Sequence, residues 1–456
     1  MLLRTPQLLW PLLVWYLQTA FGASSLRGPS AHCSYQLGSP KECPILPRTR
    51  SEGREGDAGS WQTLAPTAEG DSMMCIDGKT PYKFQFRPGS EQKLLIYLMG
   101  GGACWDREHT QTFPTCTHEP DLRDEHYQSV FSTDNPTFQD FQILKVGYCS
   151  GDGFIGNATH LDYAFGSSCT EVSPKCPRAA QNGFLHLKAA VDWLQSTGLG
   201  KSRLDYLALI GASAGAIGLH IWADDLLRRF NPLKASVVFD SYAGIFREGM
   251  QSQTFRSLNS CSLPIIPNIS GYACPYNLTL QDVLKKTMTD HSSVKFVHIN
   301  SKVDAVQMLF YDVALLLNST SVEASNFLSQ QLYYRILNQL FSSYARHENW
   351  GSYLVNGALH TYTDGRTAGS AVQDSPPGGM NFQIGSLLAE PCGLEIQSNC
   401  GEARLPSVGQ WLDILVSDIS GVSGGTDGDR QRFVCAGQQT RYTQANGSVS
   451  YCDAGI

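Results

Sequence analysis

The stretch Tyr206-Leu-Ala-Leu-Ile-Gly-Ala-Ser213-Ala-Gly215 decides the fold. Its first five residues form an apolar run typical of a buried strand, and residues 214–230 have the pattern of a helix. A Gly-x-Ser-x-Gly sequence by itself is weak evidence for a catalytic serine. The structural alternative is an ordinary strand–helix junction with a serine that caps the helix. Between a strand and a helix, however, it predicts a nucleophile elbow, a tight turn that holds Ser213 clear of the sheet. The helix N-terminus would favour negative charge developing beside that serine.

Short apolar runs alternate with helical patterns on both sides of this turn. Uninterrupted runs such as Leu94-Leu-Ile-Tyr-Leu98 are typical of strands covered by helices on both faces. The alternation predicts one α/β-hydrolase-like, doubly wound, mostly parallel sheet with helices on both faces. The expected strands are 83–87, 94–99, 142–147, 206–210, 236–239, 294–299 and 353–359, and the expected helices are 180–196, 214–230, 305–317, 326–346 and 406–418.

A serine hydroxyl needs a base, and the base needs an acid that orients it. In the order typical of this elbow, the acid and then the histidine follow the serine. Asp304 follows the expected strand 294–299, and His360 follows the expected strand 353–359. One strand each for Ser213, Asp304 and His360 fits a catalytic triad at the carboxyl ends of the strands. Asp240, which ends the strand after the elbow helix, is the second candidate acid, and it could instead be a turn residue or a loop anchor.

A glycine-rich loop, Gly100-Gly-Gly-Ala103, follows the expected strand 94–99. Acyl transfer passes through an oxyanion that needs backbone N–H donors. The amides of Gly101 and Gly102, with that of Ala214 at the elbow, are the expected donors. A phosphate-binding loop would need Gly-x4-Gly-Lys or Gly-x-Gly-x2-Gly, and neither is present there. A plain tight turn is the remaining alternative.

Composition indicates where the protein is located and which classes of partner are excluded. Charged residues are 16% of the 456, against an average of about 25%, and the net charge is −7. These values suit a secreted protein and argue against nucleic acid as a partner. Residues 1–22 resemble a secretory signal, with an apolar core too short to span a bilayer, which takes about 20 residues. We expect a poorly ordered leader over 23–69 and a single catalytic domain over 70–456, with no transmembrane span.

Fourteen cysteines behind a signal peptide predict disulfides. The sequence does not contain the tight Cys or His pairs of a zinc site, so we expect no metal. Cys33 and Cys43 could close a small loop in the leader. Proximity in sequence suggests pairing Cys104 with Cys116, Cys169 with Cys176, Cys261 with Cys274, Cys392 with Cys400, and Cys435 with Cys452. The asparagines that open Asn-x-Ser/Thr sequences, and are therefore candidate glycan sites, are Asn157, Asn268, Asn277, Asn318 and Asn446.

Several spaced motifs together resemble one family. The segments Leu98–Asp106, Tyr148–Asp152, Gly211–Gly215 and Phe239–Ser241, with those around Asp304 and His360, are similar to the pectin acetylesterase / Notum family of secreted carboxylesterases. The early Cys75-Ile-Asp-Gly78 is similar to the family's Cys-x-Asp-Gly. The similarity covers about residues 70–360, and the segment after His360 departs from the family pattern.

The resemblance implies a secreted serine hydrolase that cleaves carboxylic esters without a cofactor. Ser213, Asp304 and His360 match the family's triad, and Gly101, Gly102 and Ala214 match its oxyanion hole. The expected substrate is an acetyl ester on a polysaccharide, and a fatty acyl group on a protein is the alternative. A non-catalytic binding protein on a hydrolase scaffold is the alternative from another class. The size of the acyl slot would distinguish the two substrates.

Overall fold

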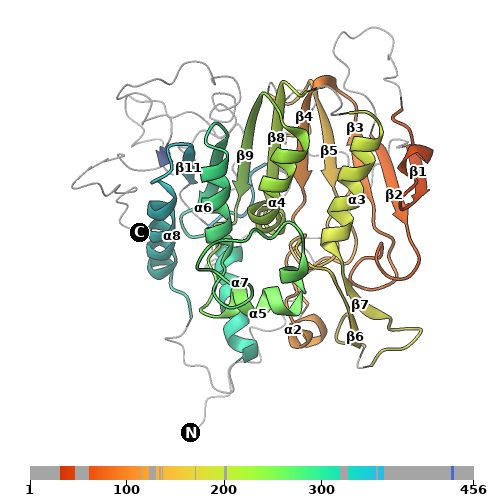
Figure 1. Ribbon diagram of the computed structural model, residues 1–456. Helices are drawn as coiled ribbons and strands as arrows, with labels where there is room; N and C mark the ends of the chain where they lie inside the picture. The colour runs from red at the N-terminus through yellow and green to blue at the C-terminus, as the bar shows by residue number, and fades with distance from the viewer. Residues whose placement is uncertain are drawn as a thin grey trace, which may run out of the picture.

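The structure is a computed structural model that describes residues 31–46, 61–112, 114–122, 130–132, 135, 137–169, 171–199, 203–318, 327–355, 358–363 and 433–435. Its main feature is a mostly parallel sheet that runs through the molecule (Figure 1). Within these residues the sheet has ten strands, in the order β1-β2-β3-β5-β4-β8-β9-β10-β11-β12, and β3 is antiparallel to both of its neighbours. The strands are β1 (Ala31–Gln36), β2 (Gln62–Thr67), β3 (Phe84–Arg87), β4 (Ser90–Leu98), β5 (Phe141–Val146), β8 (Tyr206–Ala212), β9 (Lys234–Asp240), β10 (Lys295–Ser301), β11 (Trp350–Val355) and β12 (Phe433–Cys435).

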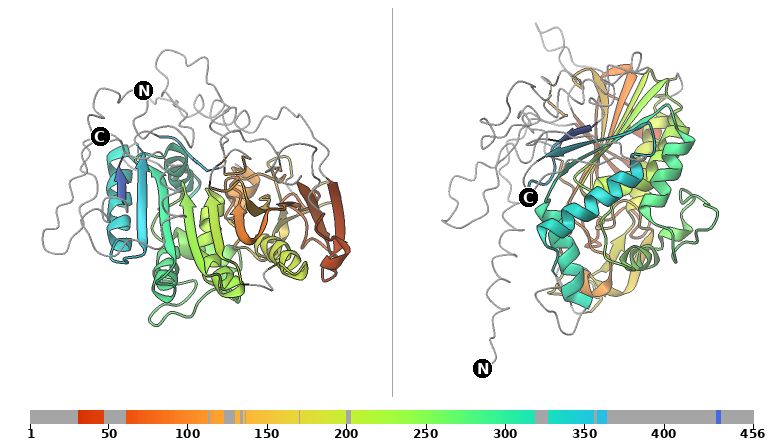
Figure 2. Two further views of the ribbon diagram at one scale, coloured as in Figure 1. Left: turned by 90° about the horizontal axis from the view of Figure 1, so that it is seen from above. Right: turned by 90° about the vertical axis from the view of Figure 1, so that its left-hand side faces the viewer.

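Helices pack against this sheet, and α3, α4 and α6 lie side by side on one face (Figures 1 and 2). The helices are α2 (Arg107–Thr112), α3 (Gly183–Ser196), α4 (Ala214–Phe230), α5 (Met250–Ser257), α6 (Leu280–Asp290), α7 (Ala305–Asn318) and α8 (Gln330–Tyr344), with the 3-10 turns η1 (Pro40–Glu42) and η2 (Ser260–Ser262). A separate antiparallel hairpin joins β6 (Ala158–Ala164) to β7 (Arg178–Gln181). Among the helices of the described ranges, none is long and apolar enough to cross a membrane.

The order of the strands creates a switch point at the centre of the sheet. From β4 the chain proceeds to β5 on one side, and from β8 it proceeds through β9, β10 and β11 on the other. β4 and β8 are parallel neighbours, with Leu98 opposite Gly211. In open α/β sheets, ligands bind outside the carboxyl ends of the strands at such a point. The glycine loop follows β4 and Ser213 follows β8, so both lie there. The predicted α/β-hydrolase-like fold is confirmed.

The core explains why these segments became buried strands. Leu94 to Leu98 of β4 and Leu207 to Ile210 of β8 are at most 2% exposed, as expected of central strands covered on both faces. Glycine allows the elbow helix to approach them closely. A Cβ added to Gly215 would lie 2.0 Å from the carbonyl oxygen of Leu98, and one added to Gly211 would lie 2.3 Å from that of Gly215. Any larger residue at either position would push α4 away from the sheet.

Within the segment 23–69, for which a poorly ordered leader was predicted, the described residues 31–46 and 61–69 contain regular structure. β1 and β2 lie within it and pair in parallel, and β2 continues into the main sheet through β3. The hydroxyl of buried Tyr35 donates to the carbonyl of Ala189 in α3, and the Trp193 indole donates to the carbonyl of Cys43. The two short strands were not predicted because the composition of this segment is of low complexity. Their burial depends on contacts with α3, about 150 residues away. The proposed signal segment 1–22 lies outside the described residues.

Five disulfides are present in the described part of the chain. Three match pairs predicted from proximity, namely Cys104–Cys116, Cys169–Cys176 and Cys261–Cys274, and Cys33–Cys43 closes the small loop. Cys75–Cys149 was not predicted, because its partners are 74 residues apart.

Two further predicted bridges are not among these five disulfides. Cys392 was expected to pair with Cys400, and both residues lie outside the described part of the chain. Cys435 was expected to pair with Cys452. Only the backbone of Cys435 is described, in β12, and Cys452 lies outside the described residues. Both bridges therefore stay predictions, as does the expected helix 406–418, which the described ranges do not include.

Candidate active site

The predicted elbow is present, with Ser213 as its strained corner. β8 ends at Ala212 and α4 begins at Ala214, and Ser213 between them has φ 53° and ψ −117°. Positive φ is uncommon outside glycine and persists where the surroundings enforce it. The Ser213 amide donates to the carbonyl of Asp240 at 2.8 Å, which ties the elbow to the end of β9. Ser213 itself is partly exposed, so its side chain is accessible.

The glycine loop after β4 lies against this corner. A Cβ on Gly100 would be 2.8 Å from the carbonyl oxygen of Ala212 and 2.9 Å from Cβ of Ser213. On Gly102, which has φ +75°, a Cβ would be 1.8 Å from the carbonyl oxygen of Thr115. The loop can therefore approach the serine turn only because Gly100 lacks a side chain, and it can pack against Thr115 only because Gly102 does.

Hydrogen bonds fix the carbonyls of Gly101 and Gly102 in the glycine loop. The carbonyl of Gly101 accepts from the Thr117 amide at 2.8 Å, and that of Gly102 accepts from the buried Tyr148 hydroxyl at 3.0 Å. Because a trans peptide points its N–H opposite to its C=O, the first bond also fixes the direction of the Gly102 N–H. Within the described ranges, no acceptor is recorded for the amides of Gly101, Gly102 and Ala214. These three amides are therefore able to donate to a ligand.

The structure brings Asp304 and His360 together. Nδ1 of His360 lies 3.0 Å from Oδ1 and 2.9 Å from Oδ2 of Asp304. The Asp304 side chain is fully buried, whereas the His360 side chain is 15% exposed. Oδ1 of Asp304 also accepts from the amides of Val306 and Gln307, and Oδ2 accepts from Nε2 of Gln307 at 3.0 Å. A carboxylate held this firmly fixes the imidazole with Nδ1 protonated, so that Nε2 is the basic nitrogen.

The second candidate acid, Asp240, has a different set of partners. Its Oδ2 accepts from the amides of Tyr362 and Thr363 and from the Thr363 hydroxyl, and its Oδ1 accepts from the Ser241 hydroxyl. The carboxylate therefore anchors the segment that follows His360. This corresponds to the loop-anchor interpretation of Asp240.

His360 lies farther from its strand than predicted. β11 ends at Val355, although the pattern predicted a strand to Leu359. The carbonyl of Ala358 accepts from the Ala305 amide, and that of Leu359 accepts from the Ser301 hydroxyl. These carbonyls thus bond to residues at and beyond the end of β10 instead of extending the parallel ladder. The turn carries His360 toward Asp304.

The other histidines near the sheet are part of the core. His298 in β10 and His220 in α4 are at most 1% exposed, and both pack against Phe239. Burial lowers the pKa of His220 to about 4 and holds the pKa of His298 well below its usual range. Both are neutral at physiological pH. In the described part of the chain, no group of three or more His, Cys, Asp or Glu residues could hold a metal ion.

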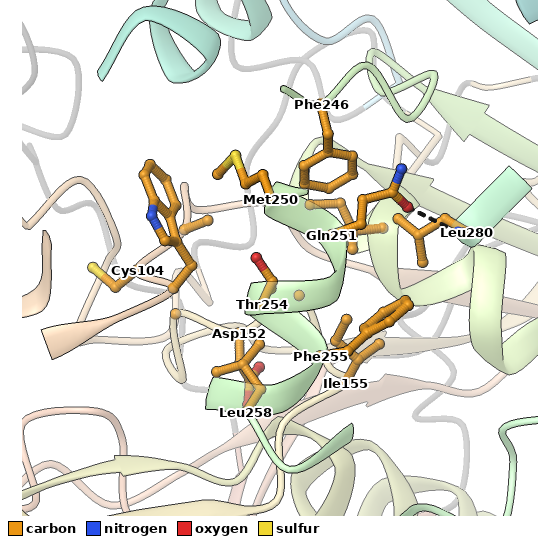
Figure 3. Close-up of a pocket in the computed structure, with 15 residues that line it drawn as sticks. Cys104, Asp152, Ile155, Phe246, Met250, Gln251, Thr254, Phe255, Leu258 and Leu280 are labelled. Carbon is orange, nitrogen blue, oxygen red and sulfur yellow. Dashed lines mark hydrogen bonds between the residues drawn. The ribbon is translucent and has the colours of Figure 1, made fainter. Parts of the chain in front are cut away.

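A small cavity with a volume of about 40 Å³ lies between α5 and the first turns of α4, and Ser213 and His360 are not among its lining residues. One wall is α5, and Figure 3 shows Met250, Thr254 and Phe255 from this helix around it. Ala103, directly after the glycine loop, and Ile217, in the first turns of α4, are also among its lining residues. The sequence did not indicate this cavity, because α5 has only 8 residues and no apolar pattern that would predict a helix.

The candidate glycan sites differ in exposure. Asn268 and Asn277 are exposed and Asn157 is half-buried. The Asn277 side chain donates to the carbonyl of Gly271 and accepts from the Ala273 amide. The side chain of Asn318 and the whole of Asn446 lie outside the described residues.

Comparison with known proteins gives one family. The family model "Pectinacetylesterase" matches residues 60–376, more than half of the chain. Two curated relatives from Arabidopsis thaliana are pectin acetylesterase 7, at 27% identity, and pectin acetylesterase 11, at 26% identity, each over 195 residues. Each match covers 41% of this chain and 46% of the relative, so the chain spans less than half the length of these relatives. The solved structure of the Wnt deacylase Notum from Drosophila is 17% identical, with a TM-score of 0.42, covering 65% of this chain and 85% of that chain. With a family model matched across the sheet, the elbow and the histidine segment, the chain belongs to the pectinacetylesterase family.

Proposed function

We propose that this chain is a serine ester hydrolase that removes acetyl groups from a polysaccharide. The observation that carries the proposal is the pairing of His360 with buried Asp304, at 2.9 and 3.0 Å, at the same sheet edge as the strained Ser213. Membership of the pectinacetylesterase family and its acetylesterase relatives support the substrate class.

In the proposed mechanism, Oγ of Ser213 attacks the acyl carbon while Nε2 of His360 takes the hydroxyl proton. The carbonyl oxygen becomes an oxyanion that accepts hydrogen bonds from backbone amides, for which Gly101, Gly102 and Ala214 are the candidates. The C–O bond to the sugar then breaks, and His360 gives its proton to the leaving alcohol. A water molecule, deprotonated by His360, attacks the acyl-enzyme. The bond between the acyl carbon and Oγ of Ser213 then breaks, His360 gives its proton to Oγ, and the products are acetate and the free serine.

We propose that the cavity between α5 and α4 receives the acyl group, and its small size then favours a short acyl group over a fatty one. Its volume of about 40 Å³ is only a few times the 10–15 Å³ that one water molecule needs. Such a space accommodates a methyl group and not a long hydrocarbon chain. Its apolar lining, with Phe255 and Ile217 among the residues, suits a methyl group that leaves water.

We also propose that the protein works outside the cell. Disulfides form and persist in oxidising compartments, and five are present in the described residues. Acetylated polysaccharides of cell walls are available to a protein in that location.

Labelling with a fluorophosphonate, followed by a panel of nitrophenyl esters from acetyl to palmitoyl, tests the proposal. We expect the protein to be labelled, Ser213→Ala to remain folded and unlabelled, and the acetyl ester to have the highest kcat/KM. Stoichiometric labelling of Ser213→Ala would show that another residue is the nucleophile. An unlabelled and inactive wild-type protein would favour a non-catalytic binding role, and a preference for the palmitoyl ester would refute the short acyl slot.

A further inference from the structure

Three residues with strained backbone are linked through the end of β9: Ser213 after β8, Ser241 after β9, and Thr361 after His360. Ser213, Ser241 and Thr361 have φ of 53°, 57° and 66°, in the left-handed region that favours glycine. For a β-branched residue such as Thr361 this conformation is a genuine outlier. Strain of this kind costs of order 1–3 kcal/mol per residue and persists only where surrounding contacts enforce it. The contacts that enforce it at Thr361, directly after the candidate base, therefore bear on how that base is placed.

Those contacts come from the end of β9. The Thr361 amide donates to Oγ of Ser241 at 2.8 Å, and Oγ of Ser241 donates in turn to Oδ1 of Asp240 at 2.8 Å. Oδ2 of Asp240 accepts from the amides of Tyr362 and Thr363 at 2.8 and 2.7 Å. Both Asp240 and Ser241 are fully buried, so these bonds do not compete with water.

The same residue holds the nucleophile. The backbone carbonyl of Asp240 accepts a hydrogen bond from the Ser213 amide, and its carboxylate accepts one from the amide of Tyr362, two residues after His360. On the other side of His360, the Ser301 hydroxyl donates to the carbonyl of Leu359. The histidine backbone is thus bracketed by bonds from the ends of β9 and β10, and Asp240 connects it to the elbow.

We propose that Asp240 and Ser241 form a clamp that positions His360 relative to Ser213 and holds the strained backbone at Thr361. The proposal rests on the proposed hydrolase function. Asp240 and Ser241 act through His360 and touch no reacting atom, so they are positioning residues. A misplacement of about 1 Å at a reacting group can cost about 100-fold in rate. The clamp therefore contributes to kcat and not to substrate binding.

Ser241→Ala is the first test, because it removes one hydroxyl and leaves the Thr361 amide without its acceptor. We expect kcat for nitrophenyl acetate and the rate of fluorophosphonate labelling to fall about 10- to 100-fold, with KM within about twofold of the wild type. Asp240→Asn should lower kcat to a similar extent, because the NH₂ group of asparagine would face the N–H and O–H groups that donate to the carboxylate. Thr287→Val, which removes an equally buried hydroxyl bonded to Val283 in α6, is the matched control and should leave kcat unchanged.

Rescue separates positioning from a general packing defect. Glycine adopts the backbone conformation of Thr361 at little cost, so adding Thr361→Gly to Ser241→Ala should restore kcat several-fold. A kcat that is unchanged in Ser241→Ala, measured on protein shown to be folded by circular dichroism, would overturn the clamp. A loss of kcat that Thr361→Gly does not restore would also overturn it. If the wild-type protein itself neither hydrolyses the ester nor reacts with the probe, the proposed function fails instead.

Discussion

Asp304→Asn should abolish most of the turnover while leaving the substrate bound as before. An asparagine keeps the size of the side chain, and its oxygen would stay with the amide donors of Val306 and Gln307. Its NH₂ group then takes the place of Oδ2, which lies 2.9 Å from Nδ1 of His360. An NH₂ group 2.9 Å from Nδ1 repels a proton on that nitrogen, and only Oδ1, at 3.0 Å and already bonded to two amides, is left to accept it, so the tautomer with the proton on Nε2 is favoured. The histidine would then face Ser213 with a proton already on the nitrogen that must take one.

The size of the loss follows from the tautomer. The same change in a well-studied triad lowers kcat about 10⁴-fold with the geometry intact. At about 1.4 kcal/mol per tenfold change, this is about 5.5 kcal/mol of transition-state stabilisation. The environment here increases the effect, because Nε2 of Gln307 lies 3.0 Å from Oδ2 and would meet a second donor. We expect KM to stay within about twofold.

The assay is steady-state hydrolysis of nitrophenyl acetate, with circular dichroism to confirm folding. Asp225→Asn is the matched control, since Asp225 pairs with Arg229 on the elbow helix and has no contact with the histidine. A variant Asp304→Asn that is folded and keeps more than about a tenth of kcat would refute the assignment of Asp304 as the orienting acid. So would a loss in Asp240→Asn that exceeds the loss in Asp304→Asn.

Three further changes test the surroundings of the site. Replacing both Cys104 and Cys116 by serine removes a disulfide between residues 12 apart in sequence and should lower the free energy of unfolding, measured by urea denaturation, by about 3 kcal/mol. It should also reduce kcat, because the glycine loop that precedes Cys104 would be less constrained. A variant as stable as the wild type would contradict this. Tyr148→Phe removes the hydroxyl that donates to the carbonyl of Gly102 and should lower kcat about tenfold at unchanged KM. An unchanged kcat would show that the glycine loop keeps its conformation without this hydrogen bond. Burial lowers the pKa of His186 to about 3, so this residue contributes stability that is present above pH 6.5 and is lost as the pH falls toward 3. Phenylalanine does not titrate, so the difference in free energy of unfolding between His186→Phe and the wild type should be about 2–3 kcal/mol more in favour of the variant at pH 4.5 than at pH 7.5. Parallel curves of stability against pH for the two proteins would refute this.

The central strands of the sheet, from β3 to β11, could be predicted because each of them carries its own signal. β4 and β8 are continuous apolar runs, and the predicted range 214–230 coincides with α4. The segments that were not predicted depend on distant partners. β1 and β2 are short and lie in a low-complexity stretch, and α5 has a single buried residue, Phe255. Such elements are stabilised by tertiary contacts that the local sequence does not encode.

The choice between the two acids shows where sequence order ceases to be informative. Asp240 and Asp304 both follow central parallel strands, so both carboxylates reach the same edge of the sheet. Their hydrogen bonds distinguish them. The oxygens of Asp240 accept four bonds from residues 241, 362 and 363, whereas both oxygens of Asp304 lie within 3.0 Å of Nδ1 of His360. A carboxylate that accepts from two backbone amides and two hydroxyls has little capacity left to orient an imidazole, and it is well suited to hold the chain that carries one. We therefore propose that Asp304 orients the imidazole of His360 and that Asp240 holds the backbone of residues 361–363.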